Sequence, residues 1–461
     1  MEQIVVALST DLALISALNK ATEDKILFSL TDDPDKALQQ LSCNPIPTLF
    51  VDTRVSHFEQ AATAVIQRLA RGEVPAVNVL TLGDASYPAS VAAELDLLEA
   101  THIRFQSAQQ ESLARVIAEA TSQPFAVPTP ESRLVESRNV SISTFTSGFF
   151  NVVDDILRVA AREVTLLLIG ETGTGKTTLA RFVHELSTRR DRQFQDLACG
   201  ALPSDLIESE LFGHIRGAFT GADRNKIGRF EAAGHGTMLL DEIDVLDLRQ
   251  QTKLLKIIET GEFEMVGSTE TRKSEARLIV ASNINLQDLV DQGQFRSDLY
   301  YRLNVLEFRL PALRDRPRDI PFLAMQFVSE LCKEHAIAIE RVDIDFLQAL
   351  RQYPWPGNLR ELKNHVRRAV LFSHDGRLTI NDLSHKVLRS QFDSGENESP
   401  GIDGWKLADR VAQSEREMLE VALRDNNNNR TQTARALGIS RVGLYKKMRR
   451  LGLASETIKS T

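Results

Sequence analysis

Little cysteine and no long apolar stretch occur in this sequence. The three cysteines, Cys43, Cys199 and Cys332, lie far apart, with no CxxC pair or histidine cluster beside them. This spacing excludes a disulfide framework and a zinc site built on cysteine. No apolar run reaches the roughly 18 residues of a membrane span. The N-terminal residues from Met1 to Ile4 lack the basic start of a signal peptide. We therefore expect a reduced, cytoplasmic setting.

Excess positive charge is also missing, except near the C-terminus. The formal net charge is −8, which argues against a protein that binds nucleic acid over its whole surface. Between Arg430 and Leu453, however, there are seven Lys or Arg residues and no Asp or Glu. A basic end on a mildly acidic chain indicates one local anion-binding module. A solvated basic helix is the alternative interpretation.

The 461 residues are 42% hydrophobic and 26% charged, which is typical of globular domains, and the length allows two to four of them. In the first 120 residues, short β-rich runs alternate with helical patterns, which predicts a parallel sheet covered by helices. The expected strands are Ile4–Leu8, Ile26–Leu30, Thr48–Asp52, Val77–Leu82 and Ile103–Phe105, and the expected helices include Leu12–Ala21, His57–Ala70 and Glu111–Ala120.

A phosphate-binding loop follows the next apolar run. Thr165–Ile169 has the continuous apolar character of a buried parallel strand. It leads into GETGTGKT, which fits GxxxxGK[ST] and precedes a helical pattern, Thr178–Leu186. Backbone N–H groups of such a loop wrap phosphates, Lys176 would reach the β and γ phosphates, and the Thr177 hydroxyl would ligate Mg²⁺. The expected nucleotide-binding residues are Gly170, Glu171, Thr172, Gly173, Thr174, Gly175, Lys176, Thr177 and Thr178.

Two carboxylates end a second apolar strand. In Met238-Leu239-Leu240-Asp241-Glu242, both acids would face phosphates bound at a neighbouring strand end. Asp241 would hold Mg²⁺ through water, and Glu242 would orient the attacking water, because phosphoryl transfer depends mostly on positioning and charge stabilisation.

Two further features leave alternatives open. Arg296 and Arg302 flank a tyrosine-rich turn, where either could serve a γ-phosphate from outside its own pocket or form an ordinary surface ion pair. In Gly217-Ala-Phe-Thr-Gly-Ala222, two glycines bracket one aromatic residue. This pattern indicates either a mobile tip that presents Phe219 and Thr220 to a partner or a buried hairpin turn.

Together these residues resemble the bacterial enhancer-binding proteins, the AAA+ activators of sigma-54 RNA polymerase. The resemblance covers roughly Leu157 to Leu388. The motifs that carry it are GETGTGKT, ESELFGH (Glu208–His214), GAFTGA, GRFEAA (Gly228–Ala233), GTMLLDEI, ALRDRPRDI (Ala312–Ile320) and YPWPGNLREL (Tyr353–Leu362). GAFTGA is close to diagnostic for this family among AAA+ ATPases.

The resemblance implies an ATP-hydrolysing hexamer or related ring whose GAFTGA loops engage sigma-54 and remodel the promoter complex. By position, Asn283 takes the first sensor place, Arg360 the second, and Arg296 and Arg302 act across subunits. Phe219 and Thr220 would touch sigma-54. The family usually carries Asn-Cys-Ala-Ala-Leu, whose Asn holds the catalytic glutamate until the partner engages. Here Ala198 stands in the Asn place and cannot form that hydrogen bond.

The C-terminal segment resembles the Fis type of helix-turn-helix. Thr431–Leu437 would be its second helix, and Arg441–Leu451, capped by Ser440, would be the helix that enters the major groove. The expected DNA contacts, to bases or phosphates of an upstream site, are Arg441, Tyr445, Lys446, Lys447, Arg449 and Arg450.

The N-terminal domain resembles a response-regulator receiver in outline only. Asp52 lies where the phospho-acceptor would be, at the end of the third strand. The acidic pair expected after the first strand is missing, since the sequence reads Ala7-Leu8-Ser9-Thr10, and Gln106 or Ser107 replaces the usual Lys. Phosphoryl transfer to Asp needs Mg²⁺, and Mg²⁺ needs those carboxylates. We therefore expect a structural or differently regulated domain.

The expected fold class is α/β with an all-α end. The boundaries are 1–122 for a degenerate receiver-like (flavodoxin-like) domain, 123–138 for a linker, 139–311 for the AAA+ α/β subdomain, 312–389 for its helical lid, 390–404 for a flexible linker and 405–461 for the helix-turn-helix domain. A rival hypothesis is a DNA-binding regulator that uses the ATPase for assembly or ligand sensing, with another sigma factor or as a repressor. Arg189 and Arg190 could serve an anionic ligand or end a solvated helix.

Overall fold

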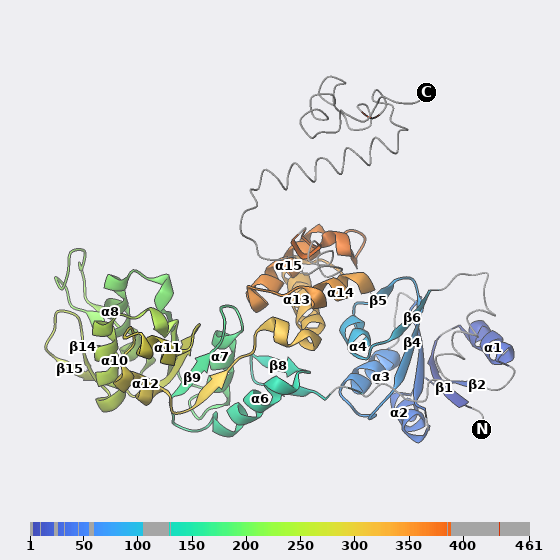
Figure 1. The fold of residues 1–461 in the computed structure, drawn as a ribbon, viewed down its shortest axis with the longest axis horizontal. Coiled ribbons are helices and arrows are strands. Elements are labelled where there is room, and N and C mark those ends of the chain that lie inside the picture. Colours follow the sequence, from blue (N-terminus) through green and yellow to red (C-terminus); the bar gives the residue numbers. More distant parts are fainter. Residues whose placement is uncertain are drawn as a thin grey trace, which may run out of the picture. The chain divides into compact units, whose positions relative to one another are not determined.

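The computed structural model describes residues 3–9, 11–22, 26–31, 33–44, 46–54, 60–104, 129, 131–384, 386–388 and 433. The chain divides into two units, Met1–Ser394 and Gly395–Thr461. Figure 1 colours the described residues along the sequence. All six predicted DNA-contact residues and the helix predicted over Glu111–Ala120 lie outside the described residues. Within the described part of the chain, no helix is long and apolar enough to cross a membrane.

The N-terminal domain is built on a parallel five-stranded sheet with the order β2-β1-β3-β4-β6. Its strands are β1 Gln3–Leu8, β2 Ile26–Leu30, β3 Thr48–Asp52, β4 Asn78–Gly83 and β6 Thr101–Arg104, and its helices are α1 Leu12–Ala21, α2 Pro34–Cys43, α3 Gln60–Ala70 and α4 Ala92–Leu97. The predicted parallel sheet is confirmed. Helix α2, which we did not predict, begins with an Asp33 cap and Pro34 in its first turn, both ordinary start signals.

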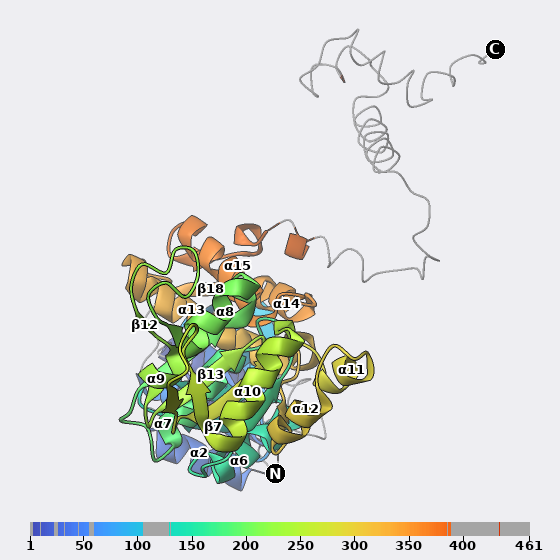
Figure 2. The same cartoon turned by 90° about the vertical axis from the view of Figure 1, so that its left-hand side faces the viewer.

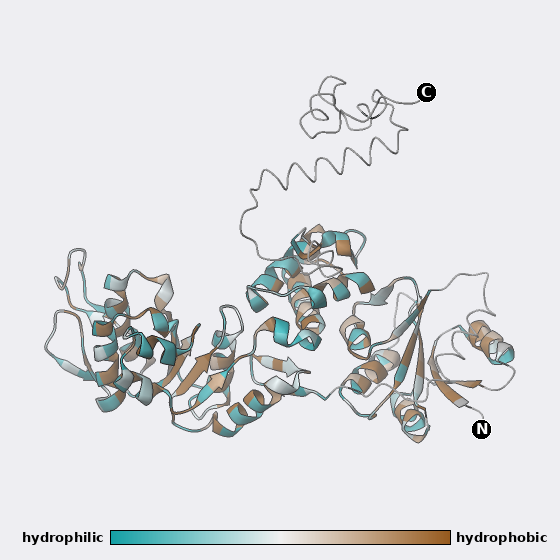
Figure 3. Cartoon of the chain, viewed as in Figure 1, coloured by the Kyte–Doolittle hydropathy of each residue, from teal (hydrophilic) through white to brown (hydrophobic). Residues whose placement is uncertain are grey.

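A second parallel sheet, with the order β10-β13-β16-β9-β17, forms the centre of the ATPase domain. Its strands are β9 Leu166–Ile169, β10 Phe194–Ala198, β13 Thr237–Asp241, β16 Arg277–Ser282 and β17 Glu307–Arg309. The strands are mostly apolar because both faces of the sheet are covered, and Figure 3 shows their hydrophobic colouring. The helices are α6 Ser147–Val159, α7 Lys176–Leu186, α8 Ser204–Phe212, α9 Arg229–Ala233, α10 Leu248–Thr260, α11 Leu286–Asp291 and α12 Ser297–Leu303.

The lid is helical and contains α13 Ile320–His335, α14 Ile344–Gln352 and α15 Asn358–Phe372. Its short strand β18 (Arg341–Asp343) pairs with β19 (Arg377–Leu378) and, in antiparallel register, with β5 (Ser86–Pro88) of the N-terminal domain. Arg341 and Arg377 both form ion pairs with Asp84. Lid and N-terminal residues also share one hydrophobic core.

The range 123–138, expected as a linker, includes an ordered strand. Strand β7 (Arg133–Glu136) pairs antiparallel with β8 (Ser141–Thr144). Polar residues and proline dominate this range, and the strand forms because Leu134 and Val135 pair with the neighbouring residues Ser143 and Ile142.

A buried carboxylate ties this hairpin to the start of the lid. Asp319, which is fully buried, accepts hydrogen bonds from the Thr144 hydroxyl at 2.7 Å and from the Phe145 backbone N–H at 2.7 Å. The Thr146 hydroxyl adds a longer bond at 3.3 Å. Burial raises the pKa of Asp319, and these hydrogen bonds oppose the rise. Asp319 therefore joins segments that are far apart in the sequence.

We expect Asp319→Ala to destabilise the protein by about 3 kcal/mol, because it leaves buried donors without an acceptor. The measurement is the midpoint of thermal unfolding. Asp315→Ala, which removes an exposed carboxylate from the same segment, is the matched control. Equal midpoints for the two variants would contradict the proposed tether.

Candidate functional site

The phosphate loop joins β9 to α7 and needs glycine for two distinct reasons. Gly173 and Gly175 have φ values of 82° and 104°, in the left-handed region that disfavours side chains. A Cβ on Gly173 would also lie only 2.5 Å from the carbonyl oxygen of Gly357 in the lid. The loop thus opens the helix N-terminus to an anion while its backbone packs against the lid.

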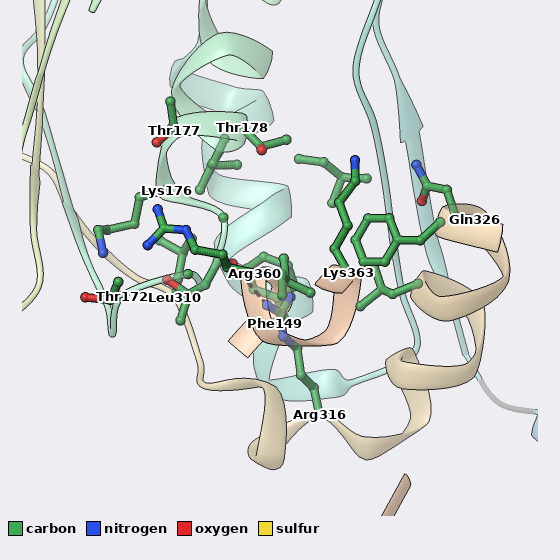
Figure 4. Close-up of a pocket in the computed structure, with 18 of the residues that line it drawn as sticks. Phe149, Thr172, Lys176, Thr177, Thr178, Leu310, Arg316, Gln326, Arg360 and Lys363 are labelled. Atoms are coloured by element: carbon green, nitrogen blue, oxygen red, sulfur yellow. Dashed lines mark hydrogen bonds between the residues drawn. The ribbon is translucent and has the colours of Figure 1, made fainter. Parts of the chain in front are cut away.

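Lys176 is the first helical residue and lines the pocket (Figure 4). Its Nζ donates to the carbonyl oxygens of Gly170 at 2.6 Å and Glu171 at 3.1 Å, and to Oδ1 of Asn283 at 2.8 Å. Burial lowers the pKa of Lys176, although the nearby charges of Asp241, Asp244 and Glu242 oppose the fall. An anionic phosphate is the natural partner for this cation.

A hydroxyl and a carboxylate meet beside the lysine. Thr177 Oγ1 donates to Oδ2 of Asp241, the last residue of β13, at 3.0 Å. Hydroxyl and carboxylate oxygens are the ligands Mg²⁺ prefers, usually together with substrate phosphates and water. In the described part of the chain, no cluster of three or more His, Cys, Asp or Glu residues forms a protein-only metal site. The Thr177 hydroxyl and the Asp241 carboxylate fit an Mg²⁺ ion that is bound together with a nucleotide.

Glu242 and Asn283 complete the polar end of the pocket. Glu242 directly follows β13 in a left-handed conformation with φ 58°, which is uncommon for a residue with a side chain. Asn283, after β16, donates from Nδ2 to Glu242 Oε1 at 3.4 Å. Parallel strands β9, β13 and β16 end at one edge of the sheet, so Lys176, Asp241 and Asn283 converge there.

The lid closes the opposite side of the pocket through Asn358. This fully buried side chain accepts from the Leu313 N–H at 2.7 Å and donates to Thr172 O at 3.1 Å and to Glu171 Oε2 at 3.2 Å. The Leu359 N–H donates to Gly173 O at 2.9 Å. Arg360 extends from the same turn towards the phosphate loop (Figure 4).

Sequence reasoning missed several other residues that line the pocket. Ser141, Ser143, Phe149 and Leu310 line it together with Arg316. Arg316 is buried, lies over the Phe149 ring with its guanidinium carbon 5.1 Å from the centroid, and donates to Thr174 O at 3.1 Å. It lies in the quoted stretch ALRDRPRDI, but only the fold brings it to the pocket.

The two predicted arginine fingers do not reach this pocket within their own chain. Arg296 forms an ion pair with Asp298 at 2.7 Å, and Arg302 forms one with Glu259 at 3.4 Å. The Arg302 side chain is 59% exposed. Whether these arginines serve a neighbouring subunit stays a prediction.

The GAFTGA stretch lies in a hairpin between β11 (Gly213–His214) and β12 (Lys226–Ile227), which projects away from the ATPase helices (Figures 1 and 2). A Cβ on Gly217 or Gly221 would meet nothing within 4 Å. Phe219 is 37% exposed and contacts the ring of His214 edge to face, with centroids 4.9 Å apart. The stretch is therefore an exposed loop and not a buried hairpin turn, and the Phe219 ring packs against His214.

In the N-terminal domain, the Arg54 guanidinium lies between the carboxylates of Asp52 and Asp11. Arg54 donates to both oxygens of Asp52, at 2.8 Å and 2.7 Å, and to Asp11 Oδ2 at 2.9 Å. Ser9 Oγ also donates to Asp52, at 3.0 Å. Hydrogen bonds from Leu14 N and Arg54 lower the pKa of Asp11. Our sequence reasoning missed Arg54 and Asp11, although both lie within two residues of positions it considered.

Arg189 is bound within its own chain. Its Nη1 donates to the carbonyl oxygens of His235, Gly236 and Glu275, and its Nη2 forms an ion pair with Glu163 at 2.7 Å. These contacts favour a structural role for Arg189 over a ligand site.

Three family descriptions match successive parts of the chain: Sigma-54 interaction domain at residues 143–309, AAA+ ATPase lid domain at 314–400, and Bacterial regulatory protein, Fis family, at 410–451. Among solved structures, NtrX from Brucella abortus in complex with ATP aligns with a TM-score of 0.50 at 22% identity, covering 98% of this chain and 100% of that one. This likeness concerns the fold alone and agrees with the receiver-like and ATPase domains.

Curated relatives extend the match. Regulatory protein AtoC of Escherichia coli is 39% identical over 312 residues, 68% of each chain. DNA-binding transcriptional regulator NtrC of Rhizobium meliloti is 39% identical over 335 residues, 66% of this chain and 68% of the relative. The formate hydrogenlyase transcriptional activator of Salmonella typhimurium is 35% identical, and the match covers 83% of this chain but 55% of that longer protein. The chain belongs to the bacterial enhancer-binding proteins, the DNA-binding AAA+ ATPases that activate transcription by sigma-54 RNA polymerase.

Proposed function

We propose that this chain assembles into a hexameric or related ring in the cytoplasm, binds an upstream DNA site, and couples Mg²⁺-dependent ATP hydrolysis to remodelling of the sigma-54 promoter complex. The observation that carries the proposal is the convergence of Lys176, Thr177, Asp241, Glu242 and Asn283 at one sheet edge, with Arg360 across from them on the lid.

Each side chain takes a role that its position supports. Lys176 and the loop amides bind the phosphates, and Thr177 and Asp241 hold Mg²⁺, which neutralises charge on the phosphates. Glu242 orients the attacking water, and Asn283 positions Glu242 through the 3.4 Å hydrogen bond. Arg360 faces the phosphates from the lid, so lid position and nucleotide state are linked.

Two further contact surfaces are part of the proposal. Phe219 and Thr220, at the projecting tip, engage sigma-54. Arg441, Tyr445, Lys446, Lys447, Arg449 and Arg450, on the predicted recognition helix, bind DNA. The basic end supplies the phosphate-neutralising charge that most protein–DNA affinity depends on.

The loop and the hydrolysis site are separable by mutation. On a sigma-54 promoter with ATP, we expect wild type to form open complexes and Phe219→Ala to lose them while ATP hydrolysis stays within about twofold of wild type. Glu242→Gln should lose both activities by at least about tenfold, because the water loses its orienting carboxylate. The exposed Phe372 of α15 supplies the matched control, Phe372→Ala. A wild-type protein that hydrolyses ATP and binds DNA but opens no sigma-54 promoter would favour the rival regulator, which acts with another sigma factor or as a repressor.

If Arg296 and Arg302 act on the nucleotide of a neighbouring subunit, two inactive variants should complement each other when they are mixed. Lys176→Ala should hydrolyse no ATP but keep its arginines, whereas the Arg296→Ala/Arg302→Ala double variant should bind ATP but hydrolyse it at least about a hundredfold more slowly. Mixing the two inactive proteins should restore part of the ATPase rate, since one subunit then supplies the nucleotide site and its neighbour the arginines.

The control is a mixture of Lys176→Ala with Glu242→Gln. In this mixture the subunit that binds ATP is also the one that lacks the catalytic carboxylate, so arginines from a neighbour cannot rescue it. That mixture should remain inactive. If the arginine double variant hydrolyses ATP at the wild-type rate, or if mixing restores nothing, the trans assignment of Arg296 and Arg302 is wrong.

A further inference from the structure

Gly200 is a glycine whose backbone does not require glycine. It lies in the turn Cys199–Ala201 that follows β10, and its φ is outside the left-handed region. A Cβ built on it would nevertheless lie 2.0 Å from Oε2 of Glu242, 3.1 Å from its Cδ and 3.7 Å from its Cβ. All three nearest atoms belong to one side chain. The space that an alanine methyl would fill is therefore occupied by the Glu242 carboxylate.

The strand order shows on which side of Glu242 this space lies. Strand β13, which Glu242 follows, is flanked by β10 on one side and β16 on the other, and the phosphate loop follows β9, beyond β16. Gly200 follows β10, so Oε2 faces away from the phosphate loop. The other oxygen, Oε1, lies 3.4 Å from Asn283 Nδ2, on the phosphate side.

Few other contacts fix the carboxylate in place. The left-handed backbone of Glu242 sets the direction of its Cβ, and the Glu242 N–H donates to its neighbour Asp241 at 3.0 Å. The adjacent Cys199 is buried, and burial raises the pKa of its thiol to about 12, so it adds no charge beside the carboxylate. The position of Glu242 thus depends on two neighbours, the open space at Gly200 and the amide of Asn283.

We propose that Gly200 is a positioning residue that gives the catalytic carboxylate a resting place on the side away from the phosphates. The inference rests on the proposed role of Glu242 in hydrolysis. In this chain, Ala198 has no side-chain donor that could hold the glutamate in its resting position. Gly200 allows that position instead, because the absence of a Cβ leaves room for the carboxylate. Productive hydrolysis requires the carboxylate to leave this space, so that Oε2 as well as Oε1 turns to the side of Asn283 and the bound nucleotide.

The test fills the space with one methyl group. In the full-length protein without sigma-54, we expect Gly200→Ala to raise kcat for ATP hydrolysis about threefold to tenfold and to leave KM for ATP unchanged, because the resting position is removed and nucleotide contacts are not. A methyl at Gly200 meets no backbone atom among its nearest neighbours, so the fold tolerates the substitution. Gly148→Ala, where a Cβ meets nothing within 4 Å, should leave both constants at wild type.

The outcomes separate this inference from the proposed function. If Glu242→Gln hydrolyses ATP like wild type, the role of Glu242 is wrong and the inference fails with it. If Glu242→Gln is inactive but Gly200→Ala has an unchanged or lower kcat with intact ATP binding, the inference alone is overturned. A rise in kcat at unchanged KM for ATP that Gly148→Ala does not show supports it, since Gly148→Ala also adds one methyl group but lies away from the carboxylate.

Discussion

The hydrogen bonds of one buried amide, Asn358, hold the nucleotide pocket together. Asn358 belongs to the lid, yet its side chain bonds to Thr172 and Glu171 in the phosphate loop and to the backbone of Leu313. A buried amide left without partners is costly, so this residue fixes the loop against the lid. Arg360, two residues further on, owes its place near the phosphate loop to that turn. Asp319 adds a second tether between the lid and the hairpin at the pocket edge.

Motifs with local geometry could be predicted from the sequence, and contacts across the fold could not. The strands at Ile26–Leu30 and Thr48–Asp52 have the predicted bounds because apolar runs and turn residues define them locally. The phosphate loop and the acids after β13 also lie together, as parallel strand ends must. Arg316, by contrast, reaches the pocket through the packing of the lid, for which no local pattern exists.

The departure at Ala198 gains meaning only from the geometry around it. Sequence comparison identifies a missing amide but cannot say where the glutamate goes without it. The structure places Glu242 between Gly200 and Asn283, at the ends of the two strands that flank β13. Ala198 lacks the hydrogen-bonding amide of the family, and Gly200, two residues later, lacks the Cβ of the alanine that the family usually has there. The resting position of Glu242 therefore depends on the volume left open at Gly200.

The receiver-like domain contains its own counter-ion. With Arg54 bridging Asp52 and Asp11, the positive charge that a dissolved metal ion would bring is covalently part of the chain. A carboxylate with both oxygens held by a guanidinium is a poor nucleophile towards a phosphoryl donor. With these contacts in place, we expect the output of the domain to be independent of the cellular supply of phosphoryl groups and magnesium. Information would then reach the ATPase through what binds to the domain surface or through how much of the protein the cell makes.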